Sequence, residues 1–63
     1  MKHITVYDKY NEILTSGNFD VSSYALNDNR VVFQYDNGQV VVVFNHMISK
    51  IVVEDIDANT DGN

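Results

Sequence analysis

The stretch RVVFQYDNGQVVVVF, residues 30–44, decides the fold. Two runs of β-branched and aromatic residues flank Asn37-Gly38, the dipeptide that best tolerates positive φ at both central positions of a type I′ turn. The pattern predicts a β-hairpin with a two-residue loop. In that register Phe33 lies opposite Val42, and Val32 lies opposite Val43.

The predicted register divides the hairpin into two faces, because opposed residues share a face of the sheet. One face is apolar throughout and is the predicted core, made of Val31, Phe33, Tyr35, Val40, Val42 and Phe44. The other face mixes polar groups with valines, and it is made of Val32, Gln34, Asp36, Gln39, Val41 and Val43. We therefore expect Phe33 and Phe44 to anchor the core.

Residues 21–26, which precede this hairpin, allow two interpretations. A three-residue loop over 27–29 pairs a strand at 21–26 with 30–35, since Asn and Asp accept the left-handed conformation. Tyr24 and Leu26 then join the mixed face. Alternatively, Asp20 caps a single helical turn that begins at Val21.

The remaining turn signals are clusters of Asn, Asp and Gly about ten residues apart, a spacing typical of a β-meander. It predicts an N-terminal hairpin over 4–7 and 13–15, a corner at 45–47 and a last strand over 48–56. The sequence thus predicts an all-β domain over 1–56, followed by a flexible acidic tail over 57–63. We expect a small antiparallel meander of about four to five strands, curled into a partial barrel or paired in a dimer.

Charge and composition exclude several classes of function. The 63 residues contain nine Asp or Glu and four Lys or Arg, a net charge of −5 at pH 7. This balance argues against nucleic acid or a membrane as a direct partner. The sequence has no cysteine, no apolar run of about 18 residues and no signal-peptide block, so we expect a cytoplasmic protein.

Candidate catalytic residues are few. His3 and His46 are the two imidazoles, and no nucleophile elbow, phosphate-binding loop or cysteine accompanies them. His46 falls in the predicted corner, where a histidine is usually solvated. We therefore predict that the protein is not an enzyme and takes no cofactor.

One motif with a known mechanism lies in the tail. Asp57, Asn59, Asp61 and Gly62 have the spacing of the first half of a calcium-binding loop, and the segment resembles the loops of EF-hands and dockerins over seven residues. The bidentate glutamate at position twelve of that loop is missing, and no helix is predicted to flank it. We therefore treat these residues as a weak metal candidate and expect a solvated tail.

Two functions from different classes remain. The first is a module that binds another protein or associates with itself as a homodimer. Its contact face comprises Tyr24, Leu26, Val32, Val41 and Val43. The second is an acidic inhibitor of the kind that phages or mobile elements encode, which imitates nucleic acid in the basic cleft of an enzyme. Its acidic surface comprises Asp28, Asp36, Glu54, Asp55 and Asp57.

Overall fold

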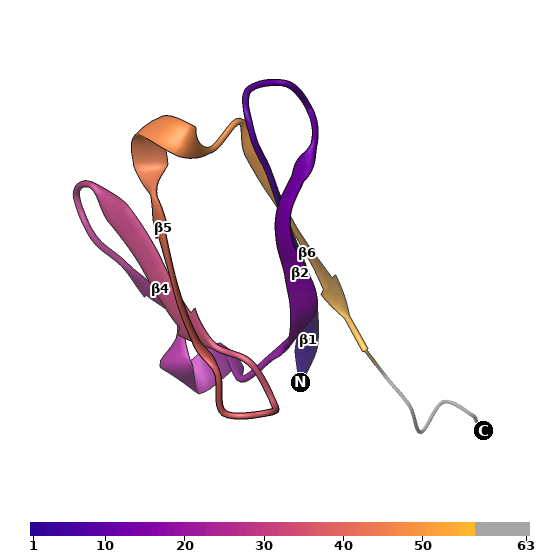
Figure 1. The fold of residues 1–63 in the computed structure, drawn as a ribbon. Helices are drawn as coiled ribbons and strands as arrows, with labels where there is room; N and C mark the ends of the chain where they lie inside the picture. The colour runs from indigo at the N-terminus through magenta and orange to yellow at the C-terminus, as the bar shows by residue number, and fades with distance from the viewer. Residues whose placement is uncertain (57–63) are drawn as a thin grey trace.

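The computed structural model describes residues 1–56, which form two three-stranded antiparallel sheets (Figure 1). The strands are β1 (Lys2–Tyr7), β2 (Ile13–Phe19), β3 (Ala25–Leu26), β4 (Arg30–Gln34), β5 (Val40–Phe44) and β6 (Lys50–Asp55). Two single 3-10 turns interrupt them, η1 (Val21–Ser23) and η2 (Asn45–Met47). The predicted small antiparallel all-β fold is confirmed, with six strands in the described residues, and the two sheets do not close into a barrel.

The first sheet has the strand order β2-β1-β6, and the second has the order β3-β4-β5. The predicted N-terminal hairpin is confirmed as β1 and β2. The last strand, β6, pairs with β1 along its whole length, from Lys2 opposite Asp55 to Tyr7 opposite Lys50. The predicted corner is the η2 turn, which carries the chain from β5 in one sheet to β6 in the other (Figure 1).

The core lies between the two sheets and comes mainly from their central strands. β1 contributes Ile4 and Val6, and β4 contributes Val31 and Phe33. The remaining buried hydrophobic residues, Phe19 and Tyr35, form the β-bridge at which the two sheets meet. The Phe33 ring lies edge-on to the rings of Phe19 and Tyr35, with centroid distances of 5.6 and 5.3 Å, so one aromatic cluster joins both sheets.

Gly17 makes room for this cluster. A Cβ atom at residue 17 would lie 2.9 Å from the Tyr35 ring, which is closer than real Cβ contacts allow. The absence of a side chain lets the Tyr35 ring pack against β2, where its hydroxyl hydrogen-bonds to Oγ1 of Thr15. Gly17 therefore allows the Tyr35 ring of one sheet to pack closely against β2 of the other.

The β4–β5 turn differs from the predicted type I′ turn. The amide of Gly38 donates to the carbonyl of Tyr35 (2.9 Å), and the amide of Tyr35 donates to the carbonyl of Gln39 (2.9 Å), which makes a three-residue loop. Gly38 has a φ of 91°, whereas Asn37 has negative φ and uses its side-chain oxygen to accept from the Gln39 amide (2.9 Å). This arrangement needs positive φ at one residue instead of two.

The extra loop residue shifts the register by one, and the predicted face assignment of β5 is therefore wrong. Phe33 lies opposite Val41 and Val31 lies opposite Val43, so Val41 and Val43 turn toward the core. The residues of β5 that were predicted to be buried are instead exposed, and these are Val40, Val42 and Phe44. Phe33 is a core anchor as predicted, but Phe44 is not.

We expect Gly38→Val to lower the free energy of unfolding by at least about 1–2 kcal/mol, because a β-branched side chain is strained at positive φ. Space is not the cause, since the nearest atom to a Cβ at residue 38 is 4.0 Å away. Gly38→Asn is the control, because asparagine accepts positive φ more readily. Thermal unfolding of the three proteins measures the effect, and identical melting temperatures contradict this turn.

Residues 21–26 resolve the two interpretations in favour of the capped helical turn. The Asp20 carboxylate accepts from the Ser22 amide (3.0 Å) and caps η1. The strand that follows is short, and Ala25 lies opposite Val32. The predicted three-residue loop is wrong by one residue, because the Asn27 amide donates to the carbonyl of Arg30 (2.9 Å) and leaves two residues in the loop.

The cap gives the protein a pH-sensitive contact. Hydrogen bonds from the Ser22 hydroxyl and then the Ser22 amide hold the pKa of Asp20 below its ordinary value. A carboxyl with a lowered pKa in the folded state stabilises the fold above its unfolded-state pKa, and this contribution is lost as the pH falls through the folded-state pKa.

We therefore expect unfolding free energy to fall on acidification, and we expect Asp20→Asn to reduce that dependence because the amide keeps a capping oxygen and does not titrate. Denaturant unfolding at several pH values between about 6 and 2 measures it. Parallel pH profiles for the two proteins contradict the assignment.

Candidate protein-binding site

The outer edge of β5 has backbone groups that no other strand of the described residues pairs. Gln39 and Asn45 flank β5 and both bond toward β4, through the Gln39 carbonyl and the Asn45 amide. Because backbone direction alternates along a strand, Val41 and Val43 also face β4. The intervening residues are Val40, Val42 and Phe44. Their N–H and C=O groups therefore lie in the plane of the sheet and point away from β4. We call this row the β5 edge.

The side chains of the β5 edge lie on the outer face of the second sheet. Val40, Val42 and Phe44 are 62%, 49% and 48% exposed. Their cross-strand neighbours on β4 are Gln34, Val32 and Arg30, and no acidic residue lies in these three pairs. The strand thus presents apolar side chains and free hydrogen-bonding groups together.

A recess borders the same strand on its core side. It has a volume of about 290 Å³ and lies between β2 and β5. Its lining comprises Leu14, Thr15, Val41, Val42, Val43, Phe44 and Met47. Since none of these side chains carries a charge, the recess suits an apolar side chain.

The other sheet edges in the described residues have features that discourage pairing with a new strand. β3 has two residues, and β6 carries Lys50, Glu54 and Asp55. The final residues of β2 already bond to the end of β4, where the Asp36 amide donates to the carbonyl of Asn18 (2.9 Å). Short length and charged side chains protect edges in natural sheets. β5 has neither, so it is the edge best suited to accept a strand.

The residues predicted to form one partner-binding face are placed on different surfaces. Val41 and Val43 pack against the core, and Tyr24 packs against Phe19 with a centroid distance of 6.0 Å. Leu26 is exposed on the short strand β3, and Val32 is half-buried on the outer face of β4. Within the predicted set, Val32 therefore lies beside the β5 edge, opposite Val42.

Sequence reasoning missed the exposed residues of β5, Val40, Val42 and Phe44. No local signal identified them, because Asn37-Gly38 suits both loop lengths. In the structure Tyr35 to Gly38 forms the turn and Asp36 lies inside the loop. The β1–β2 hairpin has the same construction, with the Asn11 amide bonded to the Asp8 carbonyl (3.1 Å) and Asn11 at a φ of 64°.

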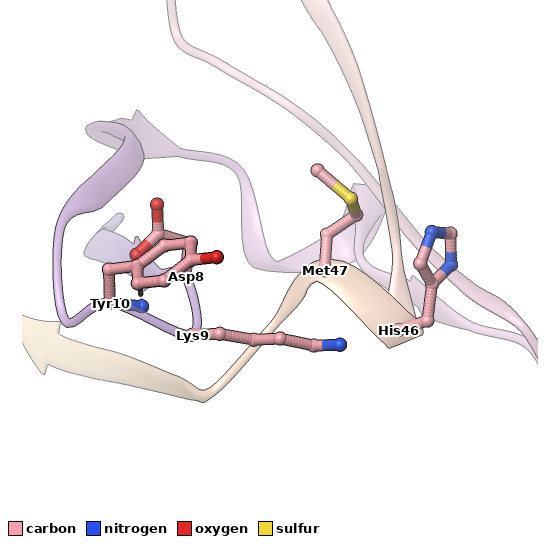
Figure 2. A pocket seen from close by; sticks show the side chains of 5 residues that line it. All are labelled: Asp8, Lys9, Tyr10, His46 and Met47. Atoms are coloured by element: carbon pink, nitrogen blue, oxygen red, sulfur yellow. Dashed lines mark hydrogen bonds between the residues drawn. The ribbon is translucent and has the colours of Figure 1, made fainter.

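A second recess, of about 230 Å³, gathers the polar side chains of the β1–β2 turn and η2. Its lining is Asp8, Lys9, Tyr10, His46 and Met47 (Figure 2). The Asp8 carboxylate accepts from the amides of Tyr10 (2.8 Å) and Glu12 (2.9 Å), so it holds the turn. In the described residues no hydrogen bond joins the His46 ring to Asp8.

The predicted acidic surface comes from separate segments. Asp28 and Asp36 are exposed in the two loops that flank β4, and Glu54 and Asp55 are exposed at the end of β6. A hydrogen bond from Lys2, together with its positive charge, holds the pKa of Asp55 below its ordinary value. Asp57 lies outside the described residues.

The weak metal candidate, Asp57, Asn59 and Asp61, also falls outside residues 1–56. Within that range no three His, Asp or Glu side chains lie close enough together to hold a metal ion. The same range contains no helix of the length and apolar character needed to cross a membrane.

Comparison with known proteins gives no relative from which to assign a function: no family model, no curated protein and no solved structure matches this chain.

Proposed function

We propose that the protein is a small, non-catalytic interaction module that binds an extended protein segment by strand addition at the β5 edge. The observation that supports this function is the outward row of backbone groups on an uncharged, apolar edge strand. An added strand satisfies those groups and gives a partner affinity without any particular sequence. We propose the cytoplasm as its compartment, as the sequence predicts.

The two sides of β5 account for selectivity in this mode. Side chains alternate along a bound strand, so half of them contact Val40, Val42 and Phe44 on the outer face. The other half point into the recess beside Leu14 and Met47. The bound segment is therefore expected to carry uncharged side chains on both sides.

The test is a titration of the isotopically labelled full chain with a synthetic peptide of alternating valine and threonine, with lysine at each end for solubility. We expect amide chemical shifts to change at Val40, Val42, Phe44 and Met47, at peptide concentrations up to about 1 mM. The matched control is the same peptide with proline at alternate positions, which removes the backbone donors it needs for strand addition.

Shift changes confined to β6, or none at all, contradict the proposal. A second titration at high salt separates it from the acidic-inhibitor alternative, which stays a prediction. Contacts through apolar burial and backbone hydrogen bonds barely weaken with salt, whereas contacts through carboxylates weaken sharply.

A further inference from the structure

The β5 edge is complementary to a second copy of itself. Its outward donors and acceptors come from Val40, Val42 and Phe44, which are evenly spaced about the central valine. When two such edges run antiparallel with Val42 facing Val42, Val40 of each lies opposite Phe44 of the other. Every outward N–H then meets an outward C=O.

The local charge at the β5 edge permits the same occupant. Each chain has a net charge of −5, so two copies repel unless they meet where carboxylates are missing. On the outer face, the residues of the β5 edge lie beside Arg30, Val32 and Gln34 of β4. None of these residues is acidic. The register also directs the Asp36-bearing turn of one copy toward η2 of the other, beside the recess lined by Asp8, Lys9 and His46.

Burial on both faces follows from this pairing. The exposed row Val40, Val42 and Phe44 continues into the same row of the second copy. On the core side, Val41 and Val43 of the two copies become neighbours at the mouth of the β2–β5 recess. β5 combines a free edge with apolar side chains on both faces and carries no charged residue, whereas the edge strand β6 carries Lys50, Glu54 and Asp55.

We infer that the partner of the β5 edge is a second copy of this chain, joined antiparallel about a two-fold axis at Val42, so that the second sheet continues across the dimer. This inference rests on the proposed function of the edge. A five-residue strand pair is a small interface, so the association is expected to be weak and concentration-dependent.

The test is sedimentation equilibrium of the full chain from about 10 µM to 1 mM, a range that suits a weak interface. We expect the mass to rise with concentration from 7.2 kDa toward twice that value. Val42→Pro removes the outward amide at the dyad and leaves the bonds to β4 intact, so it is expected to stay monomeric.

The matched control is Val53→Pro on β6. The alternation along β6 is fixed by the Ile56 amide, which donates to the Met1 carbonyl (3.4 Å), so the amide of Val53 also points away from its sheet. Val53 is 45% exposed, close to the value for Val42. Val53→Pro is expected to dimerise like the unmodified protein.

If Val42→Pro fails to fold by circular dichroism, Val42→Lys and Val53→Lys replace the pair, because two lysines then face each other across the dyad only in Val42→Lys. A mass of 7.2 kDa for the unmodified protein at all concentrations overturns the inference, and so does a folded Val42 variant that dimerises normally.

The peptide titration keeps the two proposals apart. A monomeric protein whose β5 amides still respond to the peptide overturns the second copy as partner and supports the edge as a binding site. A monomeric protein without any response overturns both.

Discussion

Phe33→Ala is expected to lower the free energy of unfolding by about 3–5 kcal/mol, the range for deleting a fully buried aromatic ring. Phe33 is 1% exposed and contacts both other members of the aromatic cluster that joins the sheets. A domain of 63 residues has a total stability of about 3–9 kcal/mol, so the expected loss is at least about a third of it. Urea denaturation followed by circular dichroism measures the change.

Phe44→Ala is the matched control, since it deletes the same ring from an exposed position on the adjacent strand. At low protein concentration we expect Phe44→Ala to lower the free energy of unfolding by about 1 kcal/mol or less, because about half of Phe44 is already exposed to water. Similar losses for the two variants support the type I′ register, in which both rings are buried, and contradict the one described above.

Ile4→Ala is expected to lower the free energy of unfolding by about 2–5 kcal/mol, because Ile4 is completely buried at the centre of β1. The deletion leaves a cavity beneath a strand that pairs on both sides, with Gly17 of β2 and Val53 of β6. Such a strand has little freedom to move inward and fill the space.

Ile13→Ala on the neighbouring strand provides the comparison, since Ile13 is 60% exposed and a surface truncation usually changes stability by about 0.5 kcal/mol or less. The melting temperatures of the two variants measure the difference. Equal losses contradict the placement of the core between the sheets.

Local patterns in the sequence were sufficient to predict the all-β class and most of the strands. The second strand runs beyond its predicted end at residue 15, and part of the segment 21–26 is the η1 turn. The β-branched runs around Asn37-Gly38 and the turn residues at 8–11 and 45–47 mark elements that the structure confirms. These signals depend on neighbouring residues, so they can be read without knowledge of the fold.

The register of β5 was not predictable in the same way. Asn37-Gly38 fits a two-residue loop and a three-residue loop equally well at the level of sequence. The choice depends on which side of β5 meets the first sheet, and a shift of one residue exchanges the two faces. All residues from Val40 to Val43 are valine, so composition did not distinguish the faces.

This ambiguity also explains the outcome for the candidate site. Val41 and Val43 were predicted to face a partner because the register was displaced, and the exposed row on the same strand was missed. The pairing of β6 with β1 was likewise not predicted, since it joins residues at opposite ends of the described chain and has no local signal.

The position of β1 between β2 and β6 has a consequence for how the chain folds. A hairpin of β1 and β2 has only marginal stability in water by itself. The other neighbour of β1 is β6, and this pairing brings Lys2 opposite Asp55, so the chain between them forms a long loop. Closing so long a loop costs entropy before any contact is gained, which places the protein among the slower-folding small domains. Because β1 depends on β6 for half of its backbone hydrogen bonds, we expect amide protons of the two strands to exchange in the same opening event.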